Sequence, residues 1–117
     1  LETKEETMPN VKLYVDETVH ARHSAALKTM LTPLRTLLCE RLTVPLAACQ
    51  LAAMSVIGLS DQPLINIELL VLPHPDRTSA LFHALGQEIR DIVAEATGVR
   101  CAVRFSLLDK ETYVALK

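Results

Sequence analysis

Met8-Pro9-Asn10-Val11-Lys12-Leu13-Tyr14-Val15 is the stretch that decides the fold. Apolar and polar residues alternate from Asn10 onward, and this period of two predicts a β-strand over residues 10–15. Val11, Leu13 and Val15 fall on one face, which we expect to be buried. The strand follows a Met-Pro pair directly, so a proline stands at the head of the first predicted element.

The Met-Pro pair also suggests where the native chain starts. Residues 1–7 have no periodicity and no core-forming content, so we interpret them as a leader added for expression and expect residues 8–117 to form a single domain. Once Met8 is removed, the native chain would begin with Pro9, whose nitrogen is then a secondary amine that can act as a base. About one residue in twenty is proline, so this use of Pro9 depends on support from the rest of the chain.

The composition favours an oligomer. Of the 117 residues, 50% are hydrophobic, yet aromatic residues make up only 3% and tryptophan is absent. A chain of this size has a high surface-to-volume ratio and cannot easily bury so much apolar surface by itself. Contacts between subunits would cover the excess, and a homo-oligomer is therefore expected.

The charge, the length of the apolar runs and the spacing of cysteine and histidine residues argue against several classes of function. The formal net charge is -2, and no basic run with interleaved aromatic residues suggests a nucleic-acid partner. No apolar run reaches the roughly 18 residues of a membrane-spanning helix. The three cysteines show no CxxC spacing, which argues against a zinc site or a disulfide framework and favours a reducing cytoplasm. His20 and His23 lack a third ligand at matching spacing, so no metal site is expected.

The apolar periodicity predicts a strand–helix–strand unit that occurs twice. The predicted strands are 10–15, 48–57, 64–72 and 99–106, and the predicted helices are 19–42 and 78–96. Each half is long enough for a right-handed parallel βαβ crossover. The fold class is therefore α/β, in the α+β sense: two βαβ units form a four-stranded sheet with both helices on one face. The other face is expected to be apolar and to be covered by a partner subunit.

Three local features give further expectations. Pro33 interrupts the long helical pattern, which predicts a kink or break near Thr32, or else two short helices with Thr32 as the cap of the second. The strand at 48–57 is apolar on both sides, so we expect it to be covered on both faces. We also expect a short strand at 112–116, near the end of the chain.

Two folds share this order of elements, the ferredoxin-like sandwich and the tautomerase fold, and the order alone does not separate them. The strand pairing does. In the tautomerase fold the first two strands are parallel neighbours and so are the last two, whereas a ferredoxin-like sheet interleaves them.

The chain resembles the tautomerase superfamily, which includes macrophage migration inhibitory factor, 4-oxalocrotonate tautomerase and 5-carboxymethyl-2-hydroxymuconate isomerase. The resemblance covers almost the whole chain from Pro9 to Tyr113. It rests on Met8-Pro9 running into a strand, on the doubled βαβ layout with a long first helix, and on two later segments. Those segments are Pro63-Leu64-Ile65-Asn66-Ile67-Glu68-Leu69-Leu70, followed by a loop and Arg77-Thr78-Ser79, and Val103-Arg104-Phe105-Ser106, followed by a tail with Thr112-Tyr113.

The resemblance implies a homotrimer that works without a cofactor and uses its terminal proline as a general base. Pro9 would take a proton from a carbon next to a carbonyl and return it elsewhere on a small keto- or enol-acid. Burial and nearby cations would lower the pKa of such an amine toward neutrality, where a base is most efficient. The resemblance also implies substrate-binding roles for Arg104, Ser106 and, near the end of the first helix, Arg41.

Simpler interpretations stay open for these residues. Arg104 can be a solvated charge on the polar face of its strand, and Arg41 can be a cation favoured by the dipole at a helix C-terminus. The sequence also departs from migration inhibitory factor. It has no clear match to that protein's CxxC motif, and it carries Leu107 and Leu108 near where aromatic residues line that protein's pocket. The alternative function is therefore a non-catalytic tautomerase-fold or ferredoxin-like module for small-ligand binding or assembly.

Overall fold

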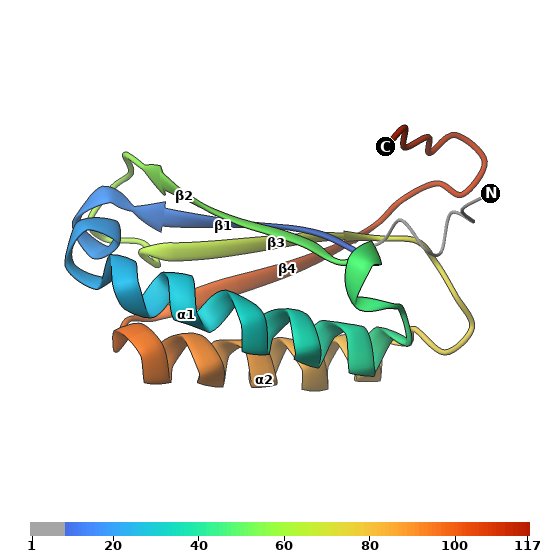
Figure 1. Cartoon of the computed structure of the whole chain (residues 1–117), viewed down its shortest axis with the longest axis horizontal. Helices are drawn as coiled ribbons and strands as arrows, with labels where there is room; N and C mark the ends of the chain where they lie inside the picture. The colour runs from blue at the N-terminus through green and yellow to red at the C-terminus, as the bar shows by residue number, and fades with distance from the viewer. Residues whose placement is uncertain (1–8) are drawn as a thin grey trace.

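The structure is a computed structural model that describes residues 9–117 (Figure 1). The leader expected at residues 1–7, and Met8 after it, lie outside the described residues. The elements are β1 (Asn10–Asp16), α1 (Glu17–Leu42), a short 3-10 helix η2 (Leu46–Ala48), β2 (Gln50–Val56), β3 (Ile65–Val71), α2 (Ser79–Thr97) and β4 (Cys101–Leu107). The predicted strand–helix–strand order, occurring twice, is confirmed.

The four strands form one sheet in the order β2-β1-β3-β4. β1 is parallel to β2, β3 is parallel to β4, and the two central strands β1 and β3 are antiparallel. Leu13 pairs with Ala53 on one side and with Ile67 on the other, and Ile67 in turn pairs with Val103. Because the parallel partners are neighbours, the tautomerase-like pairing is confirmed and a ferredoxin-like sheet is excluded.

Both helices pack on the same face of the sheet, as Figure 1 shows. Every second residue of β1 and β3 is buried beneath the helices, which confirms the alternation predicted for residues 10–15. The helices close this layer with Leu27, Leu34 and Leu38 from α1 and Leu85, Ile89 and Val93 from α2. Burial of side chains of this kind, at about 1.5–3 kcal/mol each, is the main term that stabilises the domain.

α1 continues through Pro33 without a break, and its kink lies earlier, at His23. Asp16 caps its start by accepting a hydrogen bond from the Thr18 amide at 3.1 Å. The predicted break near Thr32 is wrong, since the backbone departs from helical angles at His23, where φ is -122° and ψ is 25°. Buried apolar residues before and after Pro33 hold the helix on the sheet, and this packing offsets the hydrogen bond that the proline cannot make.

The sheet face turned away from the helices is mixed in character, so the expectation of an apolar face holds only in part. Lys12, Glu68 and Arg104 are cross-strand partners and form a charged row across it. β2 lies at the edge of the sheet and its residues are exposed or half-exposed, so the chain itself does not cover β2 on both faces. A partner that covers this face has to keep the charged row hydrated or paired.

The short strand expected at 112–116 is not formed. After β4 the chain turns at Asp109, whose carbonyl oxygen accepts hydrogen bonds from the amides of Thr112 at 3.2 Å and Tyr113 at 2.9 Å. A strand needs a neighbour, and the tail lies beside none within the described chain. Val114 and Leu116 are accordingly 73% and 93% exposed. Among residues 9–117, no helix is long and apolar enough to cross a membrane.

Candidate active site

Pro9 lies buried immediately before β1. Its carbonyl oxygen accepts a hydrogen bond from the Gln50 amide at 3.1 Å, which extends the ladder between β1 and β2 by one step. The alternation along β1 places Pro9 on the same face as Val11, toward the helices. By extension of the strand register, Cys49 and Val71 are level with Pro9 on either side, and both are buried. The position of Pro9 is therefore apolar and poor in water.

The ends of four strands and two helices converge near Pro9. β1 and β2 begin here, β3 and β4 end here, and the helices contribute the C-terminus of α1 and the N-terminus of α2 (Figure 1). This convergence follows from the parallel pairing within each half, because a crossover helix returns the chain to the end at which the first strand started. The end of the sheet that holds Pro9 is thus also the end at which most connecting segments lie.

Arg77 links the C-terminus of α1 to the segment that follows β3. Its Nη1 donates to the Leu72 carbonyl oxygen at 2.6 Å, and its Nη2 donates to the Leu42 carbonyl oxygen at 3.2 Å. Leu42 ends α1 and Leu72 follows β3, so one side chain bridges the two halves of the chain. A cation is favoured at a helix C-terminus, where the last carbonyls lack partners within the helix. No local sequence pattern points to this role of Arg77, because Leu42 is 35 residues away along the chain.

Arg104 and Ser106 lie on β4, on the sheet face turned away from the helices. Arg104 Nη1 donates to Asn66 Oδ1 at 2.8 Å. β3 separates β4 from β1, so two strand spacings, roughly 10 Å together, lie between these side chains and the strand of Pro9. Pro9 also belongs to the opposite face. Within one chain the structure does not bring Arg104 or Ser106 to Pro9, and their substrate-binding roles stay predictions.

Arg41 lies in the last turn of α1, at the same end of the molecule as Pro9. Its guanidinium forms a two-point ion pair with Glu88 of α2, with Nε–Oε2 at 3.1 Å and Nη2–Oε1 at 3.3 Å. An ion pair this exposed contributes only about 0–1 kcal/mol to stability. A substrate carboxylate would have to displace Glu88 to bind Arg41, and the substrate-binding role of Arg41 also stays a prediction.

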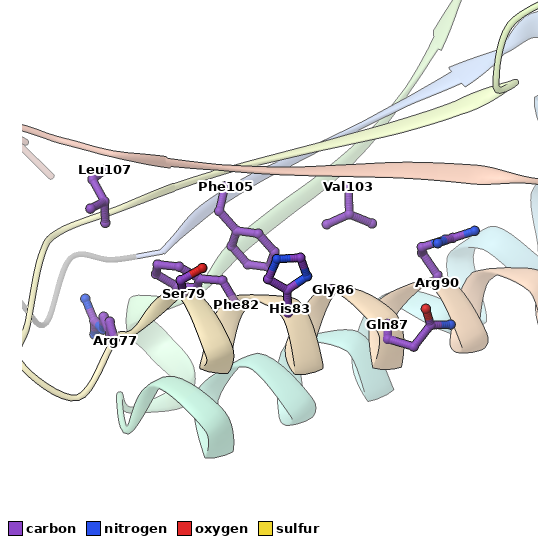
Figure 2. Close-up of a pocket in the computed structure, with 10 residues that line it drawn as sticks. All are labelled: Arg77, Ser79, Phe82, His83, Gly86, Gln87, Arg90, Val103, Phe105 and Leu107. Atoms are coloured by element: carbon purple, nitrogen blue, oxygen red, sulfur yellow. The ribbon is translucent and has the colours of Figure 1, made fainter.

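Two hollows meet at Arg77. A groove of about 540 Å³ runs between α2 and β4, with Phe82 and Phe105 in its wall (Figure 2). A second hollow of about 300 Å³ lies beside the C-terminus of α1 and includes Arg41 and His74. A third, of about 160 Å³, borders Cys49. Pro9 lines none of these three hollows, so none of them is a pocket around the candidate base.

All three cysteines are buried free thiols. Burial raises the pKa of Cys49 to about 12 and that of Cys101 to about 11, and it also raises the pKa of Cys39. Thiols that stay protonated are poor nucleophiles. Within residues 9–117, no group of three or more His, Cys, Asp or Glu side chains is placed to hold a metal ion. Because burial keeps them protonated, the three thiols are poorly suited to act as nucleophiles.

Comparison with known proteins identifies the fold. No family model and no curated protein matches the chain. Among solved structures, it is similar to a protein of unknown function from Vibrio cholerae (TM-score 0.74, 16% identity, covering 98% of this chain and 89% of that one). It is also similar to a macrophage migration inhibitory factor-like protein from Entamoeba histolytica (TM-score 0.68, 9% identity, covering 92% of this chain and 94% of that one). A fused 4-OT symmetric trimer is similar as well (TM-score 0.63, 16% identity, covering 84% of this chain and 85% of that one). The chain has the tautomerase-superfamily fold.

Proposed function

We propose that the form of this protein that begins at Pro9 is a cofactor-independent tautomerase that moves a proton on a small keto- or enol-acid. The observation that carries the proposal is the buried place of Pro9 at the head of β1, on a fold shared with a migration inhibitory factor-like protein and a fused 4-OT. A free amine at this position would be desolvated, which disfavours its protonated form and prepares it to act as a base.

The mechanism proposed for Pro9 needs no covalent intermediate. The Pro9 nitrogen takes a proton from a carbon next to the substrate carbonyl, and the electron pair moves onto the carbonyl oxygen as an enolate. The resulting ammonium returns the proton to the other end of the enolate system. Cationic side chains hold the substrate carboxylate and stabilise the enolate charge, which is the stage at which electrostatic stabilisation matters most.

We assign the cationic part of this site to a neighbouring copy in a homotrimer. Arg104 and Ser106 lie on an edge strand, and their side chains face away from the helices of their own chain. They can therefore reach a proline only across a subunit contact. Exposed apolar side chains support such contacts, with Ile57 at 89% and Leu116 at 93% exposure. Three buried free thiols fit the reducing cytoplasm that we propose as its location.

The chain as printed carries residues before Pro9, so its Pro9 nitrogen is an amide without a basic lone pair. Ketonisation of phenylpyruvate and of 2-hydroxymuconate should be measured for protein that begins at Pro9, for protein that retains Met8, and for Pro9→Ala. We expect both altered forms to be slower by about 10²–10⁴-fold, the usual contribution of general-base catalysis. Pro75→Ala, in an exposed loop, is the matched control and should keep the full rate.

Equal rates for the free-proline and Met8-retaining forms would overturn the assignment of Pro9 as base. A specific observation favours the alternative, a non-catalytic module: Glu88 already pairs with Arg41, and Asn66 already binds Arg104. If no form of the protein has activity, this alternative stands. Arg104→Ala separates the two further, because in the enzyme it should raise KM for the acid without changing the oligomer mass.

A further inference from the structure

We propose that the groove between α2 and β4 binds a medium-chain acyl carboxylate, with its carboxylate at Arg90 and its chain along Val103, Phe105 and Leu107. The groove occupies about 540 Å³, within the roughly 300–1,000 Å³ of small-molecule sites. It lies on the outer side of the second half of the chain, and Pro9 does not line it. The proposal therefore does not rest on the catalytic role of Pro9.

One wall of the groove is apolar along its whole length. Figure 2 shows Val103, Phe105 and Leu107 pointing from β4 toward α2, as the period of two along a strand requires. Four residue steps of about 3.3 Å each give this wall a length of about 13 Å. Phe82 stacks on Phe105, with ring centroids 4.8 Å apart, and thickens the wall from the helix side. An extended acyl chain fits a surface of this length and composition.

Gly86 lets Phe105 pack against α2 at the middle of the groove. A Cβ atom added there would lie 3.3 Å from the Phe105 ring, so the ring packs directly on the helix backbone. His83 and Arg90 stand one turn before and one turn after Gly86 on α2, and both are exposed. Glycine is unfavourable in a helix by about 1 kcal/mol relative to alanine, so a packing role for Gly86 explains its place better than helix propensity does.

The polar side of the groove is cationic. Its polar lining residues are Arg77, Ser79, His83, Gln87 and Arg90, and no Asp or Glu is among the ten residues that line it. This contrasts with the whole chain, in which 14 acidic residues outnumber 12 basic ones. A cleft lined by one sign of charge attracts the opposite sign. The groove is thus complementary to an anion.

Arg90 is the residue best placed to hold the anionic group. Arg77 already donates to two carbonyl oxygens, and Gln87 already donates to Asp91 at 2.9 Å. Within residues 9–117 no carboxylate pairs with Arg90. Figure 2 shows Arg90 at the end of the groove beyond Val103, where β4 begins. A carboxylate bound there directs the acyl chain past Val103 toward the exposed Leu107.

The test is calorimetric titration with decanoate, decyltrimethylammonium and acetate, together with amide NMR shifts. Decanoate should bind and shift the amides of Gly86, Val103 and Phe105. Decyltrimethylammonium has the same chain with the opposite charge and acetate has the headgroup without the chain, so both should bind at least about tenfold more weakly, the factor that corresponds to 1.4 kcal/mol. Equal binding of decyltrimethylammonium would overturn the charge argument.

Variants locate the site. Arg90→Gln removes the charge and should weaken decanoate binding about tenfold, as expected for the loss of a charge-assisted hydrogen bond. Gly86→Leu fills the groove and should abolish binding, whereas Arg22→Gln, exposed on α1, should leave it unchanged. Unchanged binding in Arg90→Gln overturns the proposal even if Gly86→Leu does not fold. A lower oligomer mass for Gly86→Leu would make the groove a subunit contact and would also overturn it.

Discussion

The half formed by β1, α1 and β2 and the half formed by β3, α2 and β4 pair their strands in the same parallel way, yet they differ in their helices. α1 has 26 residues, contains Pro33 and departs from helical angles at His23, whereas α2 has 19 residues and runs without interruption. The two halves still build one sheet and one core. Alternating buried residues on β1 and β3 therefore set the architecture, and helix regularity is secondary.

The halves also differ in the space between the helix and the edge strand. The second half contains the 540 Å³ groove, where Gly86 lets Phe105 approach the helix. The corresponding hollow of the first half, between α1 and β2, is about 160 Å³. Equivalent positions in a repeated layout thus leave a larger hollow in one half than in the other.

The largest effect is expected from the central strands, where the halves should behave alike. Leu13 and Ile67 are register partners and are 0% and 1% exposed. We expect Leu13→Ala and Ile67→Ala each to lower the free energy of unfolding by about 2–5 kcal/mol, because each leaves a cavity in the shared core. Urea denaturation followed by circular dichroism measures this. Lys28→Ala, exposed on α1, is the control, and a two-step transition in either core variant would contradict a single core.

A smaller effect concerns the thiols at the start of the second strand of each half. Burial holds the pKa of Cys49 at about 12 and that of Cys101 at about 11, against 9.0 for an unperturbed thiol. Above about pH 9 the unfolded thiols lose protons while the folded ones keep them, so stability should fall as pH rises. Near pH 10 each thiol should lower the free energy of unfolding by about 1.4 kcal/mol relative to its value at about pH 8.

Urea denaturation under reducing conditions at about pH 8 and about pH 10 measures the effect of the thiols. Cys49→Ala and Cys101→Ala should each remove part of the alkaline loss of stability, and the double variant should keep only the contribution of Cys39. An undiminished loss in the double variant would show that other groups cause it. A loss removed entirely by one substitution would show that the two halves bury their thiols to different degrees.

The smallest effect contrasts the ends of the two helices. Both α1 and α2 end in a left-handed residue, but α1 uses Thr43 with φ 56° and α2 uses Gly98 with φ 71°. Thr43→Gly should stabilise the protein by roughly 0.5–1 kcal/mol, because a β-branched residue is strained at positive φ. Gly98→Ala should destabilise it by about 1 kcal/mol for the same reason, with no steric clash to add.

Differential scanning calorimetry of the two cap variants measures both changes in stability, an increase for Thr43→Gly and a decrease for Gly98→Ala. If Thr43→Gly is destabilising instead, the threonine side chain makes a favourable contact that outweighs its backbone strain. Thr43→Ala then serves as the control, since it keeps the strain of a Cβ atom at positive φ and removes the hydroxyl.

The candidate site was less accessible to sequence reasoning than the fold. Pro9 stands out in the sequence because it directly precedes the first strand, and in the structure it is buried. Arg41 is recognisable from the sequence as a cation at a helix end, but its partner Glu88 is 47 residues away. The role of Arg77 has no local signal, because its contacts join two segments distant in the chain. Side chains whose partners are distant leave no local pattern.

By itself the sequence determined the element order and the buried face of β1, because these follow from apolar periods of 3.6 and two residues. The tertiary structure alone decided the strand order β2-β1-β3-β4, the passage of α1 through Pro33 and the groove at Gly86. These depend on packing between segments far apart in the chain, and that packing can outweigh a local preference such as the break that proline favours.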